Sequence, residues 1–301
     1  MNTTLILIKR NIKLFFKDKG AFFTSLITPL ILLVLYSTFL SNVYKDAFLA
    51  GIPEQLKYLV TDKTVNAFVG GQLFSSLLAV CCITVSFCSN MLMVTDKVTG
   101  AYNDFKISPV KPSHMSIAYF TASYVSTFII SIVAMGACLI YIAFTGWYLT
   151  LVDISLIFLD VILLVMFGTA LSSLINFFLS SQGQISAVGT VISSCYGFIC
   201  GAYMPISQFG EPLQKILVLL PGTHGTSLLR NHSLNCVFRE MEQKLNFPQE
   251  LITKLRDSVD CNIYIGDKVV PPSTMYAYLG VTIAVIIGVY IAINIVKKSK
   301  I

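Results

Sequence analysis

Five long stretches of the chain contain no Asp, Glu, Lys or Arg. They are residues 20–44, 64–95, 112–152, 161–210 and 269–296. A membrane-spanning helix needs about 20 apolar residues, so each stretch is long enough to cross a bilayer. The longest contains a polar hinge at residues 180–184, with enough apolar residues for one span on each side. The pattern predicts six spanning helices, at residues 21–43, 70–94, 115–144, 152–179, 185–204 and 275–296.

Residues 4–19, ahead of the first span, mix apolar side chains with cations. On a helix the two kinds fall on opposite faces. The apolar positions are Leu5, Ile8, Ile12, Phe15 and Phe16, and the cations are Lys9, Arg10, Lys13 and Lys17. This pattern is typical of a helix that lies in the membrane interface, and Gly20 favours a bend before the first span. The alternative is a helix that simply extends that span.

The distribution of Lys and Arg predicts the orientation in the membrane. With six spans, eleven cations fall on the side of both termini and of the loop between the second and third spans. Short cytoplasmic loops are enriched in such cations, so both termini are expected in the cytoplasm.

The opposite side holds one long segment, residues 205–274. Three prolines interrupt its first part, and we expect residues 205–230 to form a re-entrant hairpin that protein must bury. Residues 231–273 are polar and are expected to form an extracellular insertion. Within it, residues 249–259 have the apolar spacing of a short amphipathic helix.

Composition excludes a soluble domain. Apolar residues make up 55% of the chain and charged residues 12%, against about 25% charged in a typical soluble domain. The net charge of +6 follows from the topology and gives no reason to expect a nucleic-acid partner. No GxxxxGK[ST] phosphate loop and no nucleophile–base constellation is present, so we predict neither an enzyme nor a bound cofactor.

The cysteines do not suggest a metal site. Six of the eight fall inside predicted spans, where Cys behaves as a small hydrophobic residue. No Cys or His cluster has metal-ligand spacing. Cys236 and Cys261 are the two predicted to lie outside, and they form either a disulfide that closes a loop of about 26 residues or two unpaired thiols.

Two features inside the spans are candidates for function. Asp160 is an ionisable residue about two helical turns into the fourth span, and such residues commonly mark a transport path. We expect it to face the bundle, in a structural hydrogen-bonding role or in substrate passage. A stripe of small residues recurs every four positions in the fifth span and would allow a neighbouring helix to approach closely. Its members are Gly189, Ser193, Gly197 and Gly201.

Residues 96–114 read DKVTGAYNDFKISPVKPSH. They resemble the cytoplasmic loop of ABC-2-type exporter permeases, in which an acidic residue and Gly-Thr precede a short helix that ends in Ser-Pro-Val. Asp96 corresponds to the acidic residue and Gly100 to the glycine of this motif. Residues 108–110 correspond to its Ser-Pro-Val end. Ala101 stands where the family usually has Thr.

A second signature of this family lies in residues 201–230. The signature ends in Pro-x-x-His, followed after five further residues by Arg. Pro221, His224 and Arg230 match these three positions. Gly222 departs from the apolar residue that usually follows the proline. With the order of the spans, the resemblance covers the whole chain except residues 232–272.

The resemblance implies a permease subunit of the drug-exporter branch. It also implies that the subunit lies in the cell membrane of a bacterium. Such permeases work as homodimers or as pairs of homologous subunits, and a separate ATPase subunit binds ATP and Mg. The substrate expected is a small amphiphile, a drug or a peptide; polysaccharide or lipid export is the alternative. The resemblance also implies that the small-residue stripe of the fifth span faces the first span near the path. A secondary transporter or channel that uses Asp160 is the competing class.

The loop at residues 96–112 is the expected contact with the ATPase. Gly100 and Pro109 bracket a helix of two turns. Tyr102 and Phe105 lie three residues apart, so both can enter a groove on a partner, and Asp104 can pair with a cation there.

Overall fold

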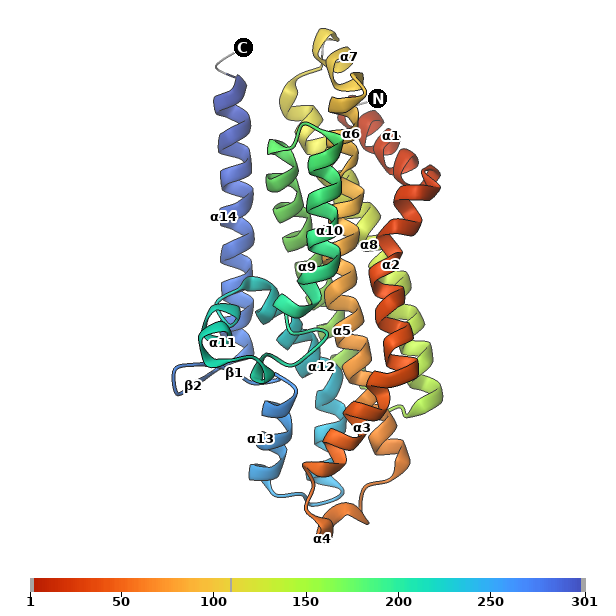
Figure 1. Cartoon of the computed structure of the whole chain (residues 1–301), viewed down its shortest axis with the longest axis vertical. Helices are drawn as coiled ribbons and strands as arrows, with labels where there is room; N and C mark the ends of the chain where they lie inside the picture. The colour runs from red at the N-terminus through yellow and green to blue at the C-terminus, as the bar shows by residue number, and fades with distance from the viewer. Residues whose placement is uncertain (1–2, 109, 299–301) are drawn as a thin grey trace.

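The computed structural model describes residues 3–108 and 110–298, and it is almost entirely helical (Figure 1). The first half of the described chain contains α1 (Thr3–Lys17), α2 (Lys19–Leu35), a π-helical segment η1 (Tyr36–Leu40), α3 (Ser41–Ala50), α4 (Glu54–Lys57), α5 (Asp62–Asn90), α6 (Leu92–Val98), α7 (Ala101–Ile107) and α8 (Pro112–Thr145). The second half contains α9 (Leu151–Phe178), α10 (Gln182–Ile199), η2 (Ile206–Gln208), α11 (Glu211–Leu217), α12 (Pro221–Gln243), α13 (Gln249–Ser258), β1 (Ile263–Ile265), β2 (Lys268–Val270) and α14 (Pro272–Lys298).

Five helical segments of the described chain are long and apolar enough to cross a membrane. They are Lys19–Ala50, Asp62–Val98, Pro112–Thr145, Leu151–Phe178 and Pro272–Ile295. The chain is therefore an all-α polytopic membrane protein, as the charge-free stretches predicted.

The predicted fifth span, residues 185–204, corresponds to α10, which is not among these five. The first turn of α10 carries two glutamines, and the helix already ends at Ile199. The chain then turns at Gly201, which has a φ of +75°. The six-span count and the cytoplasmic placement of both termini remain predictions.

Helix α5 lies at the centre of the bundle and packs against α2, α8, α9, α10 and α12 (Figure 1). Nearly all of its residues are buried. Polar groups at its end join it to two neighbours: the Ser89 hydroxyl lies 2.7 Å from that of Ser123 in α8, and Asn90 Nδ2 donates to Ser172 and Ser173 in α9. Such interhelical hydrogen bonds and close packing hold helices together in lipid, where no hydrophobic force does so.

Short polar motifs set the helix boundaries. A capping box of Thr150 and Asp153 begins α9, and another of Ser181 and Gln184 begins α10 at the predicted polar hinge. Asp18 caps α2 by accepting a hydrogen bond from the Ala21 amide. The chain therefore bends between α1 and α2 at Asp18, two residues before the glycine from which the bend was predicted.

The N-terminal helix forms as predicted, but it turns a different face to the protein. Leu7, Asn11 and Phe15 are buried, mostly against α8, whereas Leu5 from the predicted apolar face is 57% exposed. The prediction of which face of α1 is buried is therefore corrected at Leu5. The buried side overlaps the predicted apolar face at Phe15 but is rotated toward Leu7 and Asn11, because packing on α8 selects the side that is buried.

The outer segment is organised differently from the prediction. The boundary expected between residues 230 and 231 falls inside one continuous helix, α12. Both halves of α12 are buried against α5 and α9, so the change from apolar to polar sequence does not mark a structural boundary. The predicted amphipathic helix is present as α13, with Ile252 and Leu255 buried.

A buried ion pair joins the parts of this outer segment. Arg230 in α12 is fully buried, and its Nη1 lies 3.3 Å from Asp260 Oδ2, just beyond α13. Its Nη2 donates to the Gly201 carbonyl at 2.5 Å, and Asp260 Oδ2 also accepts from the Ile206 amide at 2.5 Å. Burial raises the pKa of the Asp260 carboxyl, and the positive charge of Arg230 opposes that shift. One arginine and one carboxylate thus hold α12, the end of α13 and the turn after α10 together.

Asp260→Ala should destabilise the protein, because it leaves the guanidinium of Arg230 buried without its anion. Breaking a buried pair in this way typically costs about 3–5 kcal/mol. Thermal unfolding of the purified protein in detergent measures the loss. The matched control is Asp267→Ala, which removes an exposed carboxylate from the turn between β1 and β2. Equal melting temperatures for the two variants would contradict a stabilising role for the pair.

Candidate transport cavity and coupling surface

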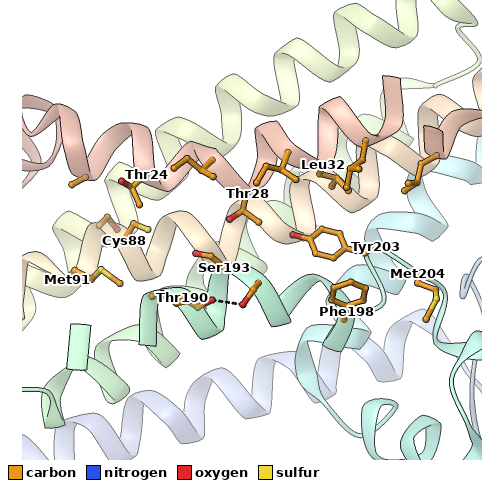
Figure 2. A pocket seen from close by; sticks show the side chains of 18 of the residues that line it. Thr24, Thr28, Leu32, Cys88, Met91, Thr190, Ser193, Phe198, Tyr203 and Met204 are labelled. Atoms are coloured by element: carbon orange, nitrogen blue, oxygen red, sulfur yellow. Dashed lines mark hydrogen bonds between the residues drawn. The ribbon is translucent and has the colours of Figure 1, made fainter. Parts of the chain in front are cut away.

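A cavity of about 1400 Å³ lies between α2 and α10, with the end of α5 behind it (Figure 2). One wall is the face of α2 that carries Thr24, Thr28 and Leu32. The opposite wall is α10, and the turn that follows it contributes Tyr203 and Met204 at one end. The cavity therefore runs along the bundle between two helices that are far apart in the sequence.

Most of the cavity wall is apolar, with a few hydroxyl groups. The Thr190 and Ser194 hydroxyls donate to carbonyls one helical turn earlier in α10. Those of Thr24, Thr28 and Ser193 have no hydrogen-bond partner within the described part of the chain. The Ser186 and Tyr203 hydroxyls also line the cavity and likewise have no partner among the described residues. Five hydroxyls are thus available to a bound molecule, and Figure 2 shows Thr28 and Ser193 near the middle of the cavity. Asp18 is the one charged residue among the described lining residues.

The small-residue stripe only partly lines this cavity. Gly189 and Ser193 do so, across from α2. At Gly197 a Cβ would lie 2.3 Å from the Tyr203 ring, so that glycine makes room for the turn that follows the helix. Gly201 lies beyond the end of α10 and accepts the hydrogen bond from Arg230. The expectation that all four face the first span is corrected, because the chain folds back over the last two.

The predicted coupling loop contains α6 and α7, joined at Gly100, whose φ of +87° favours glycine. Tyr102 and Phe105 are half-buried, and they pack on a cluster that includes Leu7 and Met115. The Arg10 guanidinium lies 5.1 Å from the centre of the Phe105 ring. Both aromatic side chains are thus partly covered by α1 and α8, and their entry into a groove on a partner remains a prediction. Pro109 lies outside the described residues.

The exposed side chains of α7 are different ones. Asp104 is exposed, as predicted, and Ile107 is 87% exposed. Sequence reasoning singled out the aromatic pair of α7 and missed Ile107, whose aliphatic side chain is the more exposed one.

Asp96, the acidic residue of the first family motif, is buried and connects three helices. Its Oδ2 accepts from Arg10 Nη1 at 2.6 Å and from the Tyr119 hydroxyl at 2.5 Å. The hydrogen bond with Asp96 raises the pKa of the Arg10 guanidinium. The neighbouring Lys97 donates to the carbonyls of Asn176, Phe177 and Leu179, which end α9. A cation suits this place because the C-terminus of a helix carries partial negative charge.

Asp160 faces the bundle interior. Its Oδ2 lies 2.6 Å from His232 Nδ1 in α12, and its Oδ1 accepts from the Tyr276 hydroxyl in α14 at 2.6 Å. Two helical turns away, Arg239 in α12 donates to Asp153 in α9 at 2.6 Å. These two pairs join antiparallel helices, and sequence reasoning missed all three partners of the carboxylates. Asp160 does not line the cavity between α2 and α10.

The second family motif forms the start of α12. Pro221 occupies the first turn, where its missing N–H costs nothing. At Gly222 a Cβ would lie 2.7 Å from the Tyr196 hydroxyl oxygen, which explains the departure from the family pattern. His224 is buried with its ring centre 4.7 Å from that of Tyr278. Together with Arg230, this motif fixes how α12 meets α10 and α14.

The structure contains no disulfide between Cys236 and Cys261. Both are buried free thiols, and burial raises the pKa of each to about 12. Cys236 is hydrogen-bonded to the Ser233 carbonyl of its own helix at 3.4 Å. The structure therefore contradicts the alternative in which Cys236 and Cys261 form a disulfide. A group of three or more His, Cys, Asp or Glu side chains able to hold a metal ion does not occur among the described residues.

These features define a helical membrane protein with a long interhelical cavity and a short helix at one end of the bundle. The sequence matches the ABC-2 type transporter family over residues 2–232, more than half of the chain. The chain therefore belongs to that family and is a permease component of an ABC transporter. The match ends at residue 232 and does not include α14, which the motif resemblance had included. A search among curated proteins finds no match.

Asp160→Ala should lower stability, because it leaves the His232 imidazole and the Tyr276 hydroxyl buried without a partner. Each unpaired group costs about 1–3 kcal/mol. Melting in detergent measures the effect, and Tyr276→Phe, which removes one partner only, should lose less. Wild-type melting of Asp160→Ala would contradict the structural role. Asp160→Asn tests the other role: wild-type transport at unchanged expression excludes Asp160 from substrate passage.

Proposed function

We propose that this chain is the permease subunit of an ATP-driven exporter and that the cavity between α2 and α10 is its substrate path. The observation that carries the proposal is a cavity of about 1400 Å³ in a family member, walled by α2 and α10 and lined mostly by apolar side chains. Pockets of this kind bind ligands by apolar contact, with a few polar groups that orient them.

The substrate proposed is a small amphiphile, a drug or a peptide. The apolar walls suit an apolar body, and the hydroxyls of Thr24, Thr28 and Ser193 can bond a neutral polar group. A polysaccharide needs many more hydrogen bonds than the few polar side chains of this mostly apolar lining offer. The secondary-transporter alternative has less support, because Asp160 lies outside the cavity and its two oxygens already have partners.

The ATPase is proposed to bind at the exposed surface of α7. Asp104 and Ile107 are the side chains available there, and the ATPase would hold the ATP and Mg. Motion of α7 can reach the cavity through α6, because Met91, Leu92 and Thr95 line the cavity and Asp96 ties α6 to α1 and α8.

A second copy, or a homologous permease, is proposed to cover the open side of the cavity in the cell membrane. Several apolar cavity residues of α2 are half exposed, among them Ile27 and Ile31. A path between two subunits would bury this surface.

Ser193→Trp should abolish stimulation of the ATPase by substrate, because the indole fills the middle of the cavity. The purified permease and its ATPase, reconstituted in proteoliposomes, are measured for ATP hydrolysis against a panel of amphiphiles. The control is Val191→Trp on the same helix, at a position that does not line the cavity. Basal hydrolysis should survive in both variants. Normal stimulation of Ser193→Trp would overturn the assignment of the path.

Ile107→Asp should weaken binding of the ATPase by about tenfold or more, as expected when a charge replaces a central apolar contact. Co-purification with the tagged ATPase measures the loss. Ile6→Asp, at an exposed position of α1, serves as the control. If Ile107→Asp co-purifies as the wild type does, the ATPase binds elsewhere.

A further inference from the structure

A second cavity lies on the other side of α2 from the proposed transport path. It has a volume of about 610 Å³ and is formed by α2, α5 and α8, with Phe16 of α1 at one end. Its lining is almost wholly apolar, and several of its residues, such as Leu30, Leu33 and Val133, are 44–68% exposed. We call this feature the α2–α8 groove. Its open apolar surface suits a hydrocarbon chain.

Lysines stand at one end of this groove. On α2 the residues Phe22, Leu26 and Leu33 line it, and Lys19 precedes them by 3, 7 and 14 positions. This spacing puts Lys19 on the same helical face as the groove. On α1, Lys13 lies three positions before Phe16 and therefore shares its face. The helix α1 and the start of α2, which carry these lysines, lie in the half of the bundle that holds the N-terminus (Figure 1).

These cations are available to a ligand. Lys13, Lys17 and Lys19 are exposed, and within the described chain none of them forms an ion pair or a hydrogen bond. The nearby carboxylate of Asp18 caps the Ala21 amide and lines the other cavity. The end of the groove therefore carries an excess of positive charge beside an apolar channel.

We propose that the α2–α8 groove binds an anionic phospholipid from the leaflet on the side of the N-terminus. An acyl chain occupies the groove, and the headgroup phosphate binds Lys13 and Lys19. The arrangement of charge selects this ligand, because an amphiphile with an anionic head and an apolar tail matches lysines at one end of a hydrocarbon-lined channel.

The test uses the full-length protein in phosphatidylcholine vesicles that contain a trace of phosphatidylglycerol with a photoreactive diazirine at the end of one acyl chain. Mass mapping should place the label in residues 22–33 and 129–141. The same probe with a phosphatidylcholine headgroup should label these segments several-fold less. Neither transport nor an ATPase is needed, so the result is independent of the proposed function.

Two pairs of variants separate the head from the tail. Lys13→Gln with Lys19→Gln should reduce labelling by phosphatidylglycerol about fivefold for each lysine, whereas Lys254→Gln with Lys268→Gln, at exposed positions of the outer segment, should not. Ala137→Trp fills the groove and should reduce labelling by both probes. Ile140→Trp, exposed on α8 outside the groove, should leave it unchanged.

Three results would overturn the proposal. The first is equal labelling by the two headgroups, and the second is label spread over all lipid-facing helices. The third is a crosslink between two copies of the chain through the groove. Size-exclusion profiles like that of the wild type exclude misfolding of the variants as the cause of any loss.

Discussion

The packing of α5 is the constraint on which the rest of the structure depends. Lipid provides no hydrophobic force between helices, so a bundle needs close contact and internal hydrogen bonds. Two glycines mark where the backbones come closest: a Cβ on Gly71 of α5 would lie 2.9 Å from the Ser233 carbonyl, and one on Gly168 of α9 would lie 2.9 Å from that of Cys82. Since α2 and α10 both pack on α5, the space left between them becomes the cavity.

Ion pairs away from this centre join segments that are far apart in the chain. Arg10 with Asp96 links α1 to the coupling segment, and a hydrogen bond between Asp160 and His232 links α9 to α12. Arg230 with Asp260 closes the outer segment over the end of α10. A buried charge is costly without a partner, so each pair fixes one arrangement of its helices. Through these pairs the surface at α7, the cavity and the outer segment form one connected body.

Motif reasoning found the right places but not always the right roles. Asp96, Gly100, Pro221 and Arg230 were identified from their resemblance to two motifs of the family, and the structure gives each a clear local function. Tyr102 and Phe105 were predicted to enter a groove on a partner, and their packing against α1 and α8 was missed, because a loop sequence contains no information about a helix that folds over it. His232 and Tyr276 could not be assigned to Asp160, since they lie 72 and 116 residues away.

The sequence by itself determined the membrane location and the helical class, because charge-free stretches of this length are stable only as helices in lipid. It also determined several helix boundaries, since the capping residues at Thr150 and Ser181 act locally. Only the tertiary structure decided which face of α1 is buried, where the stripe of α10 ends, and that Cys236 and Cys261 stay apart. Those outcomes depend on which distant segments of the chain pack together. The periodicity of apolar residues along a helix does not specify the segment against which that helix packs.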